Sequence, residues 1–181
     1  MVTIGIMVVM SGVLLAYNHS TDTQLALSVG SARIVGFLSR AKSYALEKRD
    51  LGLGPNTLVC AYGVHFANAT VSGVQTPQMT IFGTVAGSGE DCTTAQSDSG
   101  FGRLSGSGAV FVESLQLDPR LSFNFSNSPT DIAFVPPYLS TYFDGNPPGP
   151  NGYRTVTLDI AADPTKNLGV EVGPGGDISQ P

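Results

Sequence analysis

The chain has few charged residues. Asp, Glu, Lys and Arg make up 13% of its 181 residues, about half the usual share, and this scarcity excludes both a coiled coil and a charged disordered tail. There are nine basic and fourteen acidic residues, for a net charge of −5. No basic run outside one short helix could follow the phosphates of a nucleic acid, so we expect no nucleic-acid partner.

Tryptophan is also absent, whereas glycine (22 residues) and proline (12 residues) are abundant. Together with many Ser, Thr and Asn residues, this composition favours strands joined by turns over most of the chain. Apolar residues make up 41% of the sequence, which is enough to form a hydrophobic core.

Residues suited to catalysis or metal binding are few. His19 and His65 are the only histidines and Cys60 and Cys92 the only cysteines, too few and too scattered for a zinc site. No nucleophile elbow, phosphate loop or dinucleotide fingerprint occurs. His65 lies in an alternating strand pattern and is expected to be a surface or half-buried strand residue. The sequence therefore predicts a protein that is not an enzyme.

Two acidic loops, residues 89–98 and 144–151, carry the hard oxygen ligands that Ca²⁺ prefers. Neither loop has the ligand spacing of a calcium loop. Solvated turns are the alternative, and the one we favour, so no cofactor is predicted.

The two cysteines have two interpretations. In an oxidising compartment, an even number favours a Cys60–Cys92 disulfide, which would close a loop of about 32 residues and stabilise the fold by about 3–4 kcal/mol. The alternative is two free thiols, one in a strand and one in a loop.

The first seventeen residues, Met1–Tyr17, contain no charge. A helix of this length spans roughly 25 Å, slightly less than a bilayer core of about 30 Å. No basic residue precedes the run and no small-residue cleavage site follows it, so a membrane segment lacking its beginning is favoured over a secretory signal. A buried core helix is the third interpretation, disfavoured because apolar residues surround the helix axis.

From Gln24 onward the pattern becomes amphipathic, with apolar residues at steps of three, four and seven. Gly52, Gly54 and Pro55 provide a stop signal. The sequence predicts one helix of about fifty residues with two functions. Its assembly residues are Ile4, Ile6, Val9, Val13, Leu14 and Leu15, and its residues packing on the rest of the chain are Leu27, Ile34, Phe37, Leu38, Ala41 and Leu46.

The remaining sequence predicts short strands separated by turns. In one of them, Val156, Leu158 and Ile160 alternate with polar residues, which is typical of a sheet with one buried face. The expected strands cover residues 57–66, 78–85, 108–113, 120–125, 131–135, 153–160 and 167–172. The amphipathic helix is the expected cover for this sheet.

These patterns predict an α+β fold in three parts. Residues 1–23 form an apolar membrane and assembly helix. Residues 24–52 form an amphipathic helix packed on the head. Residues 53–181 form an antiparallel, β-rich globular head, which carries most of the negative charge.

Three segments resemble the type IV pilin-like proteins, and among them the minor pseudopilins of the H type. Residues 2–16 (VTIGIMVVMSGVLLA) are similar to the apolar part of a prepilin N-terminal segment. Residues 41–49 followed by 59–66 (VCAYGVHF) are similar to the helix end and first strand of such heads. The ending, residues 155–160 and 168–178, is similar to their closing hairpin.

The resemblance implies a structural subunit of a type IV pilus or type II secretion-like filament. Its partners would be other pilin-like subunits, through bundling of N-terminal helices, and the membrane. It would lie in the cytoplasmic (inner) membrane with a single pass and its head outside the cytoplasm, entering a periplasmic or extracellular filament on assembly. Family members carry a Glu at the fifth mature position, whereas Gly5 stands here. We therefore expect the leader, the cleavage site and the Glu to lie upstream of Met1.

Two alternatives come from other functional classes. A membrane-anchored cell-surface module would use the head to bind a ligand and the helix only as an anchor. A secreted hydrolase with a signal sequence is the third possibility, weakened by the lack of a nucleophile and base arrangement.

Overall fold

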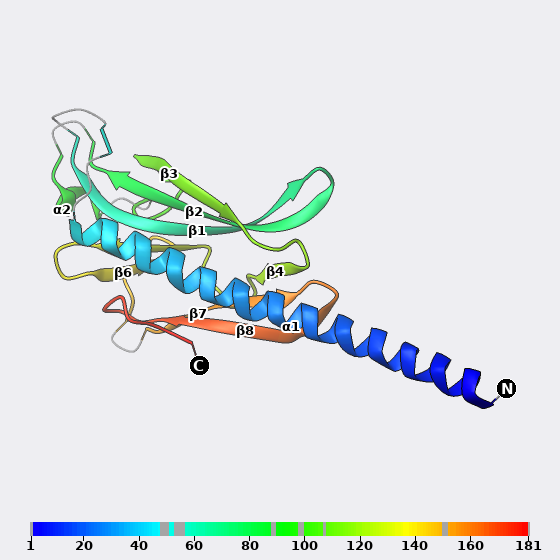
Figure 1. Cartoon of the computed structure of the whole chain (residues 1–181). Helices are drawn as coiled ribbons and strands as arrows, with labels where there is room; N and C mark the ends of the chain where they lie inside the picture. Colours follow the sequence, from blue (N-terminus) through cyan, green and yellow to red (C-terminus); the bar gives the residue numbers. More distant parts are fainter. Residues whose placement is uncertain are drawn as a thin grey trace.

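We describe the protein from a computed structural model that covers residues 2–47, 51–52, 57–87, 90–97, 100–106, 108–149 and 152–180. For residues 2–21 it describes the backbone only. The chain begins with helix α1 (Val2–Glu47), whose N-terminal turns extend beyond the rest of the molecule (Figure 1). A short helix, α2 (Cys92–Ala95), lies between strands β2 and β3. The strands are β1 (Val59–Val71), β2 (Val74–Val85), β3 (Ala109–Gln116), β4 (Leu121–Asn124), β5 (Asp131–Val135), β6 (Ser140–Phe143), β7 (Arg154–Ile160), β8 (Asp163–Val172) and β9 (Ile178–Ser179).

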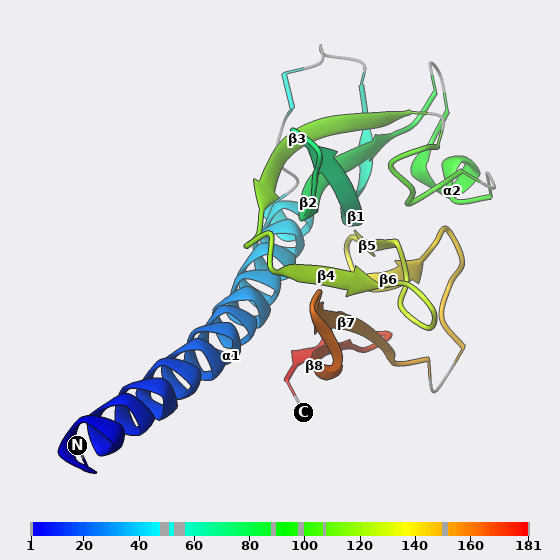
Figure 2. The same cartoon turned by 90° about the vertical axis from the view of Figure 1, so that its right-hand side faces the viewer.

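The strands form two sheets with antiparallel pairing. One has five strands in the order β3-β2-β1-β5-β6, and the other has four in the order β4-β7-β8-β9. Figures 1 and 2 show α1 running along both sheets. The β1–β2 hairpin closes at Ser72 and Gly73, which have φ angles of 52° and 82°. Glycine adopts such angles without steric cost, and this permits the tight turn.

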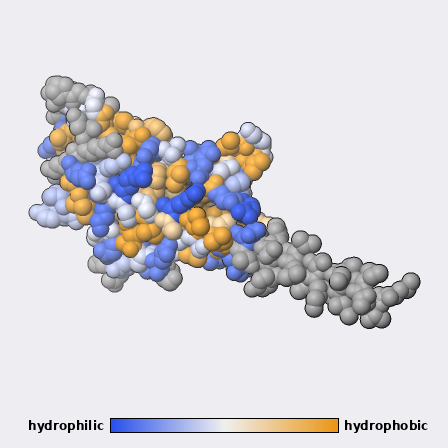
Figure 3. Space-filling view, viewed as in Figure 1, coloured by the Kyte–Doolittle hydropathy of each residue, from blue (hydrophilic) through white to orange (hydrophobic). Residues whose placement is uncertain are grey.

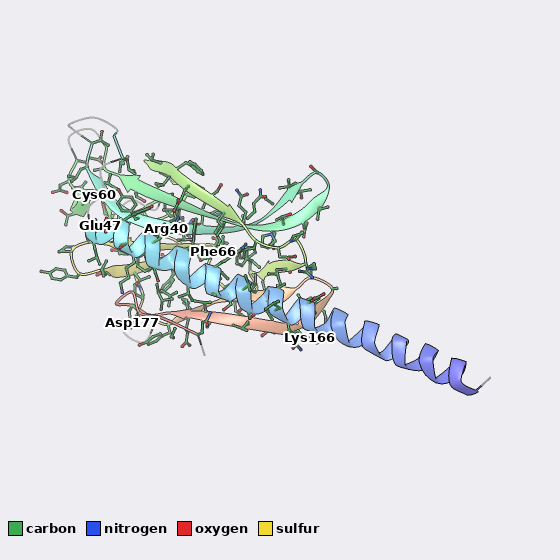
Figure 4. All side chains as sticks on the ribbon, viewed as in Figure 1. Arg40, Glu47, Cys60, Phe66, Lys166 and Asp177 are labelled. Carbon is green, nitrogen blue, oxygen red and sulfur yellow. A yellow bond between two sulfur atoms is a disulfide. The ribbon has the colours of Figure 1, made fainter. Side chains whose placement is uncertain are left out.

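The main core lies between α1 and the two sheets. Leu27, Ile34, Leu38 and Ala41 of α1 contribute side chains that are at most 6% exposed. They belong to one cluster with Tyr62, Phe66, Phe134, Leu158 and Val170 of the strands. Figure 4 shows Phe66 close to α1, and its ring meets that of Phe123 edge-on at 5.3 Å.

A second, smaller core lies between β1, β5, α2 and the segment near residue 101. It contains Cys60, Ala61, Ala95, Phe101 and Val135. The five-stranded sheet therefore has apolar contacts on both faces, and all five residues of β5 are buried.

The predicted α+β fold class, with a long pilin-like helix on a single β-rich head, is wrong. Antiparallel strands account for 46% of the residues whose side chains are described, and they form two sheets. The helical part of that set is the 26-residue segment Asp22–Glu47 of α1 together with the short α2, and it contains no long apolar helix. The prediction placed the strands in one head covered on a single face by the helix, whereas they divide into two sheets and include β6 and β9, two short strands that it missed.

In the part of the chain whose side chains the structure describes, no helix has both the length and the apolar character needed to cross a bilayer.

Candidate assembly surface on helix α1

Helix α1 is fixed to the sheets by one face. Its buried positions are Leu27, Gly30, Ser31, Ile34, Phe37, Leu38, Ala41 and Ala45, and this spacing follows the helical repeat. Gly30 marks the closest approach. A Cβ atom there would lie 2.8 Å from Leu121 Cδ1 and from Leu158 Cδ2, so the absence of a side chain lets the helix backbone reach the four-stranded sheet.

Five of the six residues expected to pack on the head are buried: Leu27, Ile34, Phe37, Leu38 and Ala41. The sixth, Leu46, is 55% exposed, and Ala45 occupies the last buried position of the stripe instead. The sequence offered two adjacent apolar residues at this turn. The helix presents the smaller one to the sheets, where Ala45 belongs to the same core cluster as Tyr62.

The expected assembly residues are Ile4, Ile6, Val9, Val13, Leu14 and Leu15. Their backbone lies in α1, but their side chains are not among those that the structure describes. Their role in assembly stays a prediction.

The outward face of α1 combines apolar, small and basic residues. Leu25 is 60% exposed and Val29 is 44% exposed. A Cβ atom added at Gly36 would meet no atom within 4 Å. Arg33 and Arg40 are exposed on the same side of the helix. Figure 3 shows this side of the molecule as a mosaic of hydrophilic and hydrophobic patches.

Two shallow grooves run between α1 and the segment from β3 to β4, and Arg33 lines both. One, of about 310 Å³, lies between Gly36, Phe37 and the β3 residues Glu113 and Leu115. The other, of about 100 Å³, lies beside Val29 and Gly30. The flank of α1 is therefore hollowed over several turns.

Two ion pairs border these grooves. Arg40 donates to both carboxylate oxygens of Glu113, at 3.1 and 3.2 Å, and this pairing raises the pKa of the Arg40 guanidinium. Arg120 binds Asp118 at 2.7 Å, and the hydrogen bond from Arg120 lowers the pKa of the Asp118 carboxyl. Because all four side chains are about one-third exposed or more, each pair adds little to stability.

Polar contacts attach the other end of the chain to α1. Lys42 Nζ donates to the carbonyl oxygen of Gly176 at 3.0 Å, and the Gln180 amide donates to the Ser31 hydroxyl. Lys42 is half-buried, and its contact with the C-terminal segment is one that sequence reasoning missed.

The predicted Cys60–Cys92 disulfide is confirmed. It joins β1 to the first residue of α2, and both cysteines contribute to the second core. The alternative of two free thiols is therefore excluded.

His65 is half-buried on β1, as its pattern predicted. Its Nδ1 lies 2.9 Å from Asp131 Oδ1 on the neighbouring strand β5. The Asp131 carboxylate also accepts from the Leu104 amide at 3.1 Å and from the Thr130 hydroxyl at 3.2 Å. These contacts connect β1, β5 and the segment before β3, so the pair has a structural role that sequence reasoning missed.

The acidic loops are used in local hydrogen bonding. Asp144 Oδ1 accepts from the Thr130 amide, the Thr130 hydroxyl and the Asp131 amide at 2.7–2.9 Å. Asp91 Oδ1 accepts from the Thr94 amide at 2.7 Å and caps α2, which lowers the pKa of Asp91. Over the described residues, no group of three or more His, Cys, Asp or Glu side chains is arranged to hold a metal ion.

No protein-family model matches this chain, and neither the curated proteins nor the solved structures contain a match to it. The resemblance to type IV pilin-like proteins therefore stays a prediction.

Proposed function

We propose that the protein is a non-enzymatic structural subunit of a filament of the type IV pilus or type II secretion kind. The N-terminal part of α1 anchors it in the cytoplasmic membrane before assembly and joins it to other subunits afterwards. The strands and α2, called here the head, lie outside the cytoplasm and form the filament surface.

One observation carries this proposal: α1 is held along one half and projects along the other. From Leu27 to Ala45 it buries one face against both sheets, whereas its N-terminal turns extend beyond them (Figure 1). The sequence of the projecting part carries no charge before Asp22. An uncharged apolar helix outside a folded head needs lipid or similar helices around it, and these two environments have nearly the same polarity.

The exposed face of α1 offers a second contact region. Leu25, Val29 and Gly36 permit close approach of a neighbouring subunit, and the exposed Arg33 supplies positive charge on a protein whose net charge is −5. This region continues the projecting helix along the side of the head.

The test introduces a charge into the projecting part, as Val9→Asp or Leu14→Asp. A carboxylate at the centre of an apolar helix costs about 3 kcal/mol in a lipid-like environment, or roughly two powers of ten in an equilibrium. We expect incorporation into filaments sheared from the producing cells to fall at least tenfold, measured by immunoblotting.

The matched control is Ala162→Asp, which adds the same charge at an exposed turn of the head. It should leave incorporation unchanged. Protease resistance and the intact Cys60–Cys92 bridge report whether each variant folds. Folded Val9→Asp and Leu14→Asp variants that enter filaments at the normal level would refute the proposal.

A second candidate function is a membrane-anchored ligand-binding module. A pocket of about 340 Å³ favours it, lined by Thr84, Glu90, Phe101 and, from the disulfide-linked α2, Ala95. The two functions share the anchor and differ in the role of the head.

A further inference from the structure

A pocket of about 340 Å³ lies next to the disulfide-linked helix α2. Its lining comes from the end of β2, from the segment after it and from Phe101. Helix α2, which contributes Ala95 to the lining, lies at the end of the head opposite α1's projecting turns (Figure 1). The volume is near the lower end of the range for small-molecule sites, so the pocket has room for a small ligand or a single side chain.

The apolar part of the pocket is rigidly held. Phe101 is 1% exposed and Ala95 is 8% exposed, and both belong to the second core. Ala95 lies on α2, which the Cys60–Cys92 bridge joins to β1. The walls are therefore formed by the folded head itself.

Two polar side chains of the lining point to a ligand. Thr84 is 2% exposed, and its Oγ1 has no hydrogen-bond partner among the described residues, which is costly for a buried hydroxyl. Glu90 is exposed, and its Oε2 accepts from the Gly87 amide at 3.1 Å. The backbone thus fixes the carboxylate at the pocket.

The local charge favours a cation. The sequence has no Lys or Arg between Arg49 and Arg103, and the Arg103 side chain donates to the carbonyl oxygen of Asp144. The neighbouring carboxylate of Asp91 is engaged by the Thr94 amide and hydroxyl. Glu90 therefore provides the charge available to a ligand.

We propose that this pocket binds an alkylammonium group, from either a lysine side chain or a small aliphatic amine. The ammonium pairs with the Glu90 carboxylate and donates to Thr84 Oγ1, while its methylene groups pack on Phe101 and Ala95. The chemistry matches the residues: a carboxylate and a hydroxyl accept from ammonium, and apolar walls accommodate an alkyl stem. This site goes beyond filament assembly and does not depend on it.

The probe is butylammonium, titrated into the full chain in nonionic detergent micelles and followed by the amide NMR signals of Gly87, Glu90 and Ala95. We expect saturable shifts with a dissociation constant on the order of millimolar, as is usual for so few atoms. Butanol, its uncharged analogue, should bind at least tenfold more weakly. A blocked Gly-Lys-Gly peptide identifies the source: tighter binding than butylammonium indicates a lysine of a partner protein, and weaker binding indicates a free amine.

Three variants test the assignment of residues. Glu90→Gln should weaken butylammonium binding at least tenfold, and Thr84→Val, which removes the hydroxyl at nearly constant volume, by a few fold. Gly87→Ala places a Cβ atom 2.7 Å from Glu90 Oε2. It displaces the carboxylate but keeps its charge, and should weaken binding about fivefold or more.

Matched controls are Glu113→Gln, at the α1 groove, and Gly36→Ala, which has open space around it. Both should bind butylammonium normally. The proposal is overturned if butanol binds as well as butylammonium, if no shifts appear up to 50 mM, or if Gly87→Ala and Glu90→Gln both bind normally. Should Glu90→Gln not fold, Gly87→Ala alone decides. The filament assay above is independent, since Glu90→Gln should assemble normally.

Discussion

The two sheets differ in how they are buried. The five-stranded sheet has apolar cover on both faces, from α1 and from the second core, and β5 is buried throughout. The four-stranded sheet packs Val156, Leu158 and Val170 against α1, while Thr155 and Thr157 are only half-buried. The four-stranded sheet therefore depends on the fit of its single interface with α1. The five-stranded sheet is also stabilised by the second core and by the Cys60–Cys92 disulfide.

The strongest test of this contrast removes the disulfide. Cys60→Ala with Cys92→Ala should lower the free energy of unfolding by about 4 kcal/mol, since the bridge closes a 32-residue separation. The second core should loosen first, so proteolysis should begin within residues 90–106. Urea unfolding followed by tyrosine emission measures the loss, because the chain has six Tyr and no Trp. A loss below about 1 kcal/mol would contradict the role given to the bridge.

The next test truncates the one-faced sheet. Leu158 is 0% exposed, and Leu158→Ala should cost about 3 kcal/mol through lost burial and the cavity left behind. The same urea titration measures it. The control is Phe111→Ala on the edge strand β3, where the ring is 63% exposed and the expected change is below about 0.5 kcal/mol. Equal losses in the two variants would show that α1 does not seal this sheet.

A pair of glycine substitutions tests the close approach of α1 to the same sheet. Gly30→Ala should destabilise by about 1 kcal/mol, because crowding against Leu121 and Leu158 outweighs the gain in helix propensity. Gly36→Ala, in open space, should stabilise by about 0.5–1 kcal/mol. Thermal unfolding monitored by circular dichroism shows whether each variant is more or less stable than the parent chain. Stabilisation by Gly30→Ala would mean that the leucines move aside without cost.

The smallest expected effect concerns the ion pair between Asp118 and Arg120, just before β4. Arg120 lowers the pKa of Asp118, so the folded state holds the carboxylate more strongly than the unfolded state does. The resulting stability is present above the unfolded pKa of about 3.9 and is lost as pH falls through the lower folded pKa. Because the pair is exposed, it is worth at most a few tenths of a kcal/mol.

Arg120→Gln tests the contribution of this ion pair. The variant should be slightly less stable than the parent chain at pH 7, and the difference should vanish near pH 2, as measured by urea midpoints at both values. A difference that persists at pH 2 would assign the effect to packing of the Arg120 stem.

The elements that the sequence could predict are those whose pattern is local. The alternation in β7 and the apolar spacing from Leu27 to Ala41 each indicate an element and its buried face. The seven expected strands all appear, although β1 continues to Val71, past Asn68 and Thr70, because a hairpin can carry polar residues on its exposed face.

What the sequence could not predict depends on distant contacts. β6 and β9 have four and two residues, which is short for a recognisable strand pattern, and each is defined by its pairing, β6 with β5 and β9 with β8. The choice of Ala45 over Leu46 for the buried face depends on the position of the sheets. The pocket near Glu90 combines residues from β2, α2 and the segment between α2 and β3, a combination that the spacing of residues along the chain does not predict.

The contacts of α1 have a consequence for how the protein is made. This helix is synthesised first, yet its buried stripe is completed by β7, β8 and β9, and Ser31 meets Gln180 across a separation of 149 residues. At a ribosomal rate of about 5–20 residues per second, roughly ten seconds pass between synthesis of the buried face of α1 and synthesis of these strands. During that interval Ile34, Phe37 and Leu38 are exposed on a nascent chain. The order of synthesis thus makes complete docking of α1 a late folding step.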